Sequence, residues 1–494
     1  MLQMSKSPYI LAIDQGTSST RAALIDKKGV IVDQESIEFK QIYPANGWVE
    51  HDPLEIIQTV KSTIAIILKR NAIIQNDIVS CGITNQRETI VAWDKVSGKP
   101  LYNAIVWQDR RTQEICQKLA DKDYTNLIQE KTGLIIDPYF SASKIQWLLE
   151  HIKEQKNLIV GTIDTWIIWN LTNKAQHVTD ITNASRTMLY NIVDETWDQQ
   201  LLDLFKVDKS FLPKVLSNID DFGTIHSEHF GIEIPIGGVI GDQQSASVGQ
   251  LCLKKGMIKA TYGTGCFVLI NTDDNKIKSE NKLLSTIASK LDGKKQYAVE
   301  GSIFNAGTVV QWLRDEMEIF NDVSEIESLI KSSKNDITFI PAFTGLGAPY
   351  WKSDTRGTIY GITRDTSKGD IVKAALKSIC FQTKDLLESL KLDLGDQMEE
   401  GMTMRVDGGM SNNNWMMQFL ADILNIKVER PTNHETTVMG AAYLAGLRVG
   451  FFSSLRDIED LWKSDRVFVP SMDADERQLM YANWKKTVNN LIGL

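Results

Sequence analysis

Tyr9-Ile-Leu-Ala-Ile-Asp14-Gln-Gly-Thr-Ser-Ser-Thr20-Arg21-Ala-Ala-Leu-Ile25 consists of two apolar, strand-like runs joined by a turn rich in Gly, Thr and Ser. The same plan recurs in Met257-Ile-Lys-Ala-Thr-Tyr262, the turn Gly263-Thr-Gly265 and Phe267-Val-Leu-Ile270. Because one such hairpin occurs in each half, the sequence predicts a duplicated domain. Gly and Thr also suit ordinary hairpin turns, so coincidence remains the alternative. We expect one domain over residues 1–249 and a second over residues 250–494, with the boundary between Gly241 and Gly256.

Helical patterns separate the strand patterns. Asp52 and Pro53 precede apolar residues at helical spacing, which predicts an N-cap and a first turn. Residues 371–390 and 415–424 carry the same spacing. Strands alternating with helices indicate α/β sheets in both halves.

The overall composition excludes several classes of protein. Among 494 residues, 54 Lys and Arg stand against 63 Asp and Glu, giving a net charge of −9. No basic tract interrupts this balance, so we expect no nucleic-acid partner. No apolar run reaches the roughly 18 residues of a membrane span, so we expect no membrane insertion. Five scattered cysteines without a C-x-x-C pair indicate reduced thiols, and hence a cytoplasmic location.

The first hairpin carries groups that suit phosphate. An Asp at the end of a buried strand is costly unless something neutralises it, and Asp14 occupies such a position. Thr17, Ser18 and Ser19 offer backbone N–H groups and hydroxyls to phosphate oxygens, and Arg21 adds a positive charge. An Asp beside a phosphate cradle makes sense if a divalent cation lies between the two anions. The alternative is an Asp that only hydrogen-bonds the turn.

Asp242 follows the apolar run 236–240, so we expect it to end a strand before a helix that begins at Gln243. Ligands of open α/β sheets bind at such strand ends. A carboxylate there could accept a proton from an alcohol during phosphoryl transfer. The alternative is that Asp242 simply caps the helix.

Two further motifs follow strands. Arg87 and Glu88 place a donor beside an acceptor, which a polyhydroxylated ligand requires, although an adjacent Arg and Glu more often form a surface ion pair. Gly409 allows the backbone to approach a flat ligand, and Asn413 could donate to a base ring. A tight turn explains the glycine equally well. The sequence has neither a P-loop nor the motifs of protein kinases.

Taken together, these motifs resemble the FGGY carbohydrate kinase family, and within it the glycerol kinases. The resemblance is carried by Asp14-Gln-Gly-Thr17, Asn85-Gln-Arg-Glu88, Val106-Trp-Gln-Asp-Arg-Arg111, Gly241-Asp-Gln-Gln244, Thr261-Tyr-Gly-Thr-Gly-Cys-Phe267 and Arg405-Val-Asp-Gly-Gly409. The two family signatures are similar to Tyr139-x-Ser141-x-x-Lys144-Ile145-x-Trp147 and to Gly345-Leu-Gly-Ala-Pro-Tyr-Trp351 through Gly361-Ile-Thr363. The similarity runs from about Tyr9 to Phe452.

The resemblance implies an actin-like ATPase fold, with two RNase H-like domains and a nucleotide cleft between them. It implies transfer of the γ-phosphoryl group of ATP to glycerol, giving sn-glycerol 3-phosphate and ADP, by a homo-oligomer (dimer or tetramer). The implied glycerol-binding residues are Arg87, Glu88, Trp107, Tyr139, Asp242, Gln243 and Phe267, with Asp242 catalytic. The implied ATP-binding residues are Thr17, Ser18, Ser19, Arg21, Thr264, Gly307, Gln311, Gly409 and Asn413, and Asp14 and Asp242 would face Mg²⁺.

Two alternatives remain open. A non-metabolic actin-like ATPase, such as a chaperone or filament protein, would share the two hairpins. It would have no reason to combine Arg87, Glu88, Trp107 and Tyr139 with Asp242. Within the family, a kinase for another polyol or a ketose is the second alternative.

Overall fold

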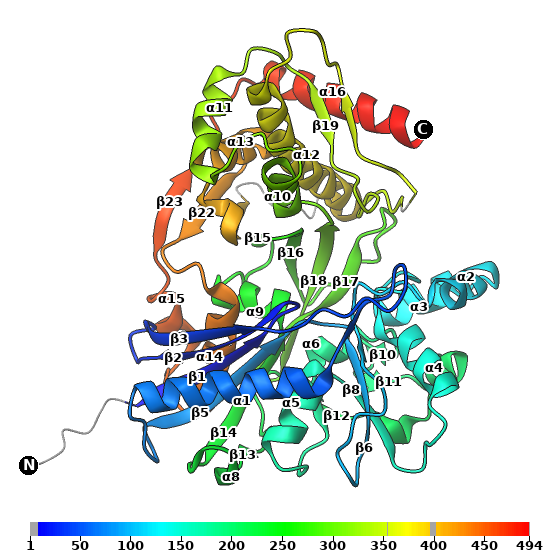
Figure 1. Ribbon diagram of the computed structural model, residues 1–494, viewed down its shortest axis with the longest axis vertical. Coiled ribbons are helices and arrows are strands. Elements are labelled where there is room, and N and C mark those ends of the chain that lie inside the picture. Colours follow the sequence, from blue (N-terminus) through cyan, green and yellow to red (C-terminus); the bar gives the residue numbers. More distant parts are fainter. Residues whose placement is uncertain (1–7, 353, 396–401, 494) are drawn as a thin grey trace, which may run out of the picture.

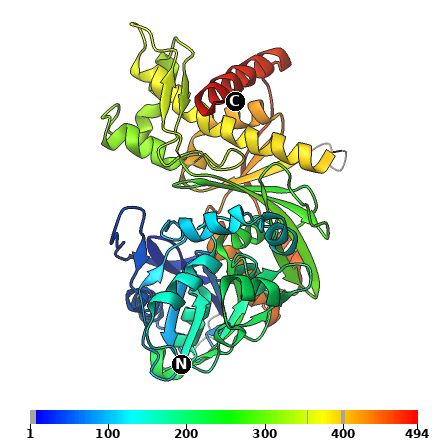
Figure 2. The same ribbon diagram turned by 90° about the vertical axis from the view of Figure 1, so that its right-hand side faces the viewer.

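The structure is a computed structural model that describes residues 8–352, 354–395 and 402–493. Two halves lie one above the other, and each is built on one large mixed β-sheet (Figure 1). The long strands of residues 258–303, drawn in green, belong to the second sheet and lie next to the first half in the turned view (Figure 2).

The first sheet has the order β13-β14-β5-β1-β2-β3. Its strands β1, β2 and β3 form an antiparallel meander, and β1 pairs in parallel with β5, which pairs in parallel with β14. The strands are β1 (Tyr9–Gln15), β2 (Ser19–Ile25), β3 (Ile31–Glu38), β5 (Ile78–Asn85), β13 (Thr224–Ile225) and β14 (Ile234–Gly241).

The second sheet has the order β17-β18-β16-β15-β21-β22-β23. Strands β15, β16 and β18 form an antiparallel meander, and β15 pairs in parallel with β21, which pairs in parallel with β22. The strands are β15 (Ile258–Tyr262), β16 (Cys266–Asp273), β17 (Leu284–Leu291), β18 (Lys294–Ile303), β21 (Thr403–Asp407), β22 (Lys427–Pro431) and β23 (Ser464–Phe468).

The two sheets repeat one topology. The five strands β3-β2-β1-β5-β14 of the first correspond in direction and order to β18-β16-β15-β21-β22 of the second. Both predicted hairpins are present as β1–β2 and β15–β16, so the predicted duplication is confirmed. Shorter strands form three two-stranded sheets and one of four strands: β4 (Glu50–His51), β6 (Ile90–Asp94), β7 (Ala104–Ile105), β8 (Leu158–Thr162), β9 (Val178–Asp180), β10 (Tyr190–Asn191), β11 (Thr196–Trp197), β12 (Lys214–Leu216), β19 (Thr338–Ile340) and β20 (Thr358–Tyr360).

The helices cover the sheets, and the three predicted from spacing are present as α1, α12 and α13. Asp52 caps α1 as predicted, because its side chain accepts from the backbone N–H of Leu54 at 2.8 Å. The helices are α1 (Pro53–Arg70), α2 (Gln113–Asp121), α3 (Thr125–Thr132), α4 (Ser141–His151), α5 (Ile163–Leu171), α6 (Ile181–Ala184), α7 (Gln199–Phe205), α8 (Ser227–Phe230), α9 (Asp242–Gly249), α10 (Gly307–Asp315), α11 (Ile326–Ser332), α12 (Lys368–Leu394), α13 (Asn414–Leu424), α14 (Thr436–Arg448), α15 (Leu455–Glu459) and α16 (Ala474–Ile492).

Strand β1 is apolar on both faces because helices cover both. Leu11 and Ile13 pack in the core that α1 completes, whereas Ile10 and Ala12 pack against α14 from the other end of the chain. The α14 backbone lies so close to β5 that a Cβ at Gly82 would come within 2.1 Å of the carbonyl oxygen of Ala441. The C-terminal part of the chain therefore supports the first sheet directly.

The division of the chain into domains of residues 1–249 and 250–494 stays a prediction. Helix α9, before this boundary, packs on α14, which lies after it. No helix among the described residues is long and apolar enough to span a bilayer.

Candidate functional site

The first hairpin turns more tightly than predicted. Asp14 lies in β1 opposite Arg21 of β2, so the turn itself is confined to residues 16–18. Gly16 closes the turn by donating its N–H to the carbonyl of Ser19 at 2.9 Å. Ser19 and Thr20, expected in the turn, therefore belong to the strand, because antiparallel pairing continues up to that point, and Arg21 lies in the strand as predicted. Arg21 forms an ion pair with Glu435, just before α14.

Two carboxylates lie at the strand ends of the first sheet. Burial raises the pKa of the Asp14 carboxyl to about 6; the Arg21 charge opposes this shift, and the nearby Asp242 adds to it. Asp242 is the first residue of α9, one position earlier than predicted. Gly241, not Asp242, is the N-cap residue, but Oδ1 of Asp242 still accepts from the backbone N–H of Gln243 in the first turn at 2.6 Å. The same oxygen lies 3.1 Å from Nε of Arg87.

Arg87 and Glu88 are buried, so the surface ion-pair interpretation is wrong. The side chain of Arg87 is 2% exposed and lies 4.0 Å from Glu88, and its closer partner is Glu300 of β18. Glu300 accepts from Nη1 of Arg87 at 2.6 Å, from Nη2 of Arg87 at 3.2 Å and from Nη2 of Arg186 at 2.8 Å. Arg186 also donates to Glu88 at 2.6 Å. These four residues, the buried charge cluster, join the two halves.

The two carboxylates of the buried charge cluster differ in their titration. Burial raises the pKa of Glu88, although Arg186 and Arg87 act in the opposite direction. Burial also acts to raise the pKa of Glu300, but Arg186 and Arg87 outweigh it, so that pKa lies below its ordinary value. Glu300 therefore remains ionised while it bridges two guanidinium groups.

Sequence reasoning missed Arg186 and Glu300. A single Glu within the apolar run Ala298-Val-Glu300-Gly-Ser-Ile303 was the available signal, because an unpaired carboxylate is not tolerated in a buried strand. Arg186 follows the short helix α6 and carried no comparable signal.

Three aromatic residues predicted for one site do lie together. The ring of Trp107 meets Tyr139 edge-on at 5.6 Å between centroids and Phe267 of β16 at 6.2 Å. Nε1 of Trp107 donates to Oγ1 of Thr17 at 3.0 Å. These three residues form an aromatic wall. Trp107 attaches the wall to the turn of the first hairpin, and Phe267 belongs to the second sheet.

The second sheet has one apolar and one polar face. Ile258, Ala260 and Tyr262 of β15 pack in the core of the second half, so Lys259 and Thr261 project to the opposite face. The register of β15, β16, β18 and β21 places further residues on that face: Phe267, Leu269, Glu300, Ser302 and Asp407. This polar face of the second sheet contacts α9 and the first half of the chain.

The residues expected near the nucleotide border the second hairpin. The carbonyl of Thr264 accepts from the N–H groups of Ala306 and Thr308, and a Cβ at Gly307 would lie 2.5 Å from the carbonyl oxygen of Gly263. Helix α10 therefore begins in direct contact with the turn, and Gln311 lies exposed on it.

Gly409 and Asn413 lie together between β21 and α13. Gly409 is exposed, and Asn413 caps α13 by accepting from Met416 at 2.8 Å through its Oδ1. Its Nδ2 has no hydrogen-bond partner among the described residues and so stays available as a donor.

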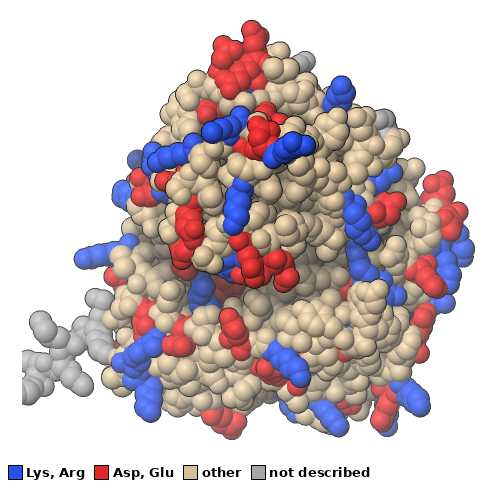
Figure 3. Space-filling model, turned by 45° about the horizontal axis from the view of Figure 1, so that its top comes forward, with Lys and Arg blue, Asp and Glu red and all other residues tan. Residues whose placement is uncertain are grey.

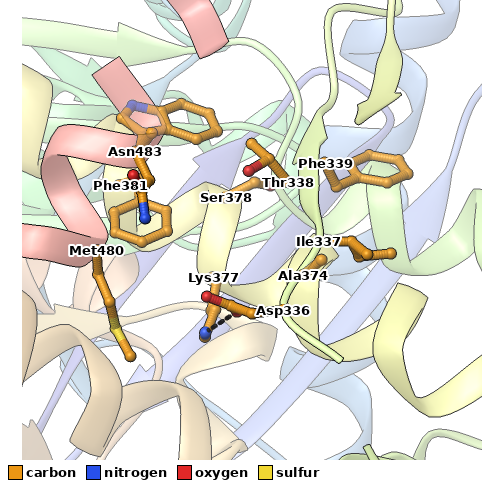
Figure 4. A pocket seen from close by; sticks show the side chains of 11 residues that line it. Asp336, Ile337, Thr338, Phe339, Ala374, Lys377, Ser378, Phe381, Met480 and Asn483 are labelled. Carbon is orange, nitrogen blue, oxygen red and sulfur yellow. Dashed lines mark hydrogen bonds and ion pairs between the residues drawn. The ribbon is translucent and has the colours of Figure 1, made fainter. Parts of the chain in front are cut away.

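The molecular surface is hollowed between the two halves, and charged side chains line the rim of the hollow (Figure 3). A separate small pocket lies between α12 and α16, where Lys377 donates to Asp336 at 2.6 Å (Figure 4). None of the predicted site residues lines that pocket.

Known proteins are similar to this chain in both sequence and fold. Residues 9–249 and 258–449 match the N-terminal and C-terminal domains of the FGGY family of carbohydrate kinases. The chain is 50% identical to a glycerol kinase of Marinomonas sp. over 98% of this chain and 99% of that one, and 50% identical to one of Bacillus licheniformis over 97% and 98%.

A Plasmodium falciparum glycerol kinase crystallised with ADP superposes with a TM-score of 0.91 at 41% identity, covering 98% of each chain. With its two repeated sheets, the chain has the two-domain actin-like fold, and it belongs to the FGGY family of carbohydrate kinases.

Proposed function

We propose that this chain transfers the γ-phosphoryl group of ATP to glycerol, forming sn-glycerol 3-phosphate and ADP. The observation that carries the proposal is identity of about one half to named glycerol kinases over nearly the whole of both chains. The ADP in the crystals of the Plasmodium falciparum relative supports the nucleotide part.

We assign the acceptor site to the group formed by the buried charge cluster and the aromatic wall. Arg87, Glu88, Tyr139, Asp242 and Gln243 supply donors and acceptors to the hydroxyls of glycerol. Trp107 and Phe267 cover its carbon backbone, since their two rings meet edge to face and offer an apolar surface.

Asp242 is the catalytic base of this proposal. It lies at a strand end, and the guanidinium of Arg87, 3.1 Å away, fixes the position of the carboxyl group that accepts the hydroxyl proton. Phosphoryl transfer needs positioning and charge neutralisation more than covalent help, and the remaining residues supply these.

The phosphates of ATP lie between the two hairpins. Thr17, Ser18, Ser19 and Arg21 bind them from the first half, and Thr264 binds them from the second. Arg21 exchanges its ion pair with Glu435 for a phosphate oxygen when ATP binds. The remaining residues of the nucleotide site are Gly307, Gln311, Gly409 and Asn413.

The carboxylates of Asp14 and Asp242 fit a magnesium ion. Strands β1 and β14 both pair in parallel with β5, so Asp14 and Asp242 lie at the same edge of the first sheet, where their carboxylate oxygens would suit a hard divalent cation. If Mg²⁺ is held there by Asp14 and Asp242 together with ATP, it would neutralise charge on the transferring phosphate. We further propose a cytoplasmic homo-oligomer; the five cysteines are all buried and free, as a reducing compartment permits.

An assay of the purified enzyme with ATP and Mg²⁺ across glycerol, dihydroxyacetone, erythritol and xylulose tests the proposal. We expect glycerol to give the highest kcat/KM, with a product identified as sn-glycerol 3-phosphate. A higher kcat/KM for xylulose or erythritol would assign the chain to another substrate of the family. ATP hydrolysis stimulated by a peptide or polymer and indifferent to polyols would instead make it an actin-like ATPase.

A further inference from the structure

Lys259 is a fully buried lysine that the proposed mechanism does not use. It projects from β15 onto the polar face of the second sheet, with 0% of its surface exposed. Its Nζ donates to Oε1 of Gln243 at 2.5 Å. Among the described residues it forms no ion pair with a carboxylate. Burial lowers its pKa, and Asp407 and Asp242 oppose that shift from a greater distance.

A lysine buried in this way does not stabilise the fold. Removing an ammonium group from water costs free energy that a single amide oxygen does not recover. An apolar side chain of the same length would fill the same space without that cost. The position of the charge therefore points to a role in the site rather than in the core.

The contact with Lys259 determines which way the carboxamide of Gln243 faces. An ammonium group can only donate hydrogen bonds, so of the two polar atoms of the amide only the oxygen can be its partner. With Oε1 held by Lys259, the Nε2 group must point away from the second sheet. Gln243 is half-exposed, it directly follows Asp242, and its Nε2 has no hydrogen-bond partner among the described residues.

We propose that Lys259 is a positioning residue of the acceptor site, which fixes the Gln243 amide so that its N–H₂ donates to a hydroxyl oxygen of the polyol. This inference rests on the proposed function and deepens it. Without Lys259 the amide rotates between two orientations, and one of them presents an oxygen, which cannot donate to the hydroxyl oxygen. Lys259 thus determines that Gln243 presents a donor, and not an acceptor, to the polyol.

Steady-state kinetics with four proteins test the inference: wild type, Lys259→Met, Gln243→Ala and the double variant. We expect Lys259→Met to raise the KM for glycerol about tenfold. The KM for ATP should stay within about twofold of the wild-type value, and the melting temperature should not fall. In the Gln243→Ala background, Lys259→Met should have no further effect on the KM for glycerol, because the amide through which it acts is gone.

Lys377→Met is the matched control. Lys377 is also a buried lysine of the second half, but it pairs with Asp336 in the pocket of Figure 4, away from the site. Its replacement should leave the KM for glycerol unchanged and lower the melting temperature.

Three results would overturn the inference: an unchanged KM for glycerol in folded Lys259→Met, additive effects in the double variant, or an equal rise in the KM for ATP. If Lys259→Met does not fold, Gln243→Glu decides, since a carboxylate pairs with Lys259 but cannot donate. It should raise the KM for glycerol at least as much, and an unchanged value would refute the role. Wild-type enzyme inactive on glycerol would refute the proposed function instead, before any variant is compared.

Discussion

Replacing Glu300 by Gln removes one negative charge from the centre of the buried charge cluster. In the wild type, Glu300 accepts three hydrogen bonds from Arg87 and Arg186, and none of the three side chains is more than 2% exposed. Gln keeps the shape of the side chain. Its NH₂ group, however, would face a guanidinium, so two donors would meet without an acceptor.

The structure sets the size of the expected effect. Breaking a buried ion pair by removing one partner costs about 3–5 kcal/mol, because the other charge stays buried without compensation. At about 2–4 °C per kcal/mol for a domain of this size, the melting temperature should fall by roughly 6–20 °C. Arg87 is released at the same time, so the KM for glycerol should rise about tenfold or more.

Glu195→Gln is the matched control. Glu195 also joins two cations, Lys290 and Lys295, but its side chain is 27% exposed. A pair of that kind contributes about 0–1 kcal/mol, so the control should melt within about 4 °C of the wild type. The two carboxylates differ in burial and in the cations that they join, which are arginines for Glu300 and lysines for Glu195. Equal losses in the two variants, or Glu300→Gln melting like the wild type, would refute the reasoning from burial.

The pH dependence gives a second check on Glu300. The two guanidinium groups hold its pKa in the folded state below the ordinary value of 4.5. A carboxyl whose folded-state pKa is lowered stabilises the fold above its unfolded pKa, and that stability is lost as the pH falls through the folded value. The difference in the free energy of unfolding between wild type and Glu300→Gln should therefore be constant near neutral pH. It should shrink in acid, below about pH 4.5. Denaturant unfolding from pH 7 to pH 3 measures it.

Three further predictions concern the acceptor and metal sites. Asp242→Asn should lower kcat by about 10²–10⁴ while ATP still binds in calorimetry, and a variant with more than half of wild-type turnover would exclude Asp242 as the base. Arg87→Ala and Glu88→Ala should raise the KM for glycerol far more than that for ATP in steady-state assays, whereas equal losses would make the pair structural. Asp14→Asn should melt at a higher temperature than the wild type at pH 8 without Mg²⁺, because the folded-state pKa of about 6 makes ionisation of Asp14 unfavourable to folding. That gain should diminish as the pH is lowered towards 4, and a gain independent of pH would contradict the assignment.

The hairpins and the larger helices could be predicted from the sequence because their signals are local. Alternation of apolar residues, the turn residues and the Asp52 cap all lie within a few positions of what they determine. The clustering of Trp107 with Tyr139 and Phe267 could be predicted only through the family resemblance, since no local pattern brings them together.

The partners of Arg87 could not be predicted, because they come from distant parts of the chain. Glu300 is 213 residues away from Arg87, and Gln244, which also accepts from Nη1 of Arg87, is 157 residues away. A buried charge in a strand signals that a partner exists, but only the packing of the two halves identifies it. The same limit made Arg87 and Glu88 look like a surface pair, because adjacency in sequence is visible and burial is not.

The register of the second sheet explains why Lys259, Phe267 and Glu300 all contact the acceptor site. Leu269 of β16 pairs with Glu300 on one side and with Lys259 on the other, and Phe267 lies two positions before it. Side chains on a strand alternate between faces, so this register places all three residues on the face that contacts the first half. A shift of one position between β16 and β18 would direct Glu300 into the apolar core and leave Arg87 and Arg186 without their shared carboxylate. The acceptor site therefore depends on strand pairing within the second half as much as on its own residues, and separating the two halves would dismantle all three contacts at once.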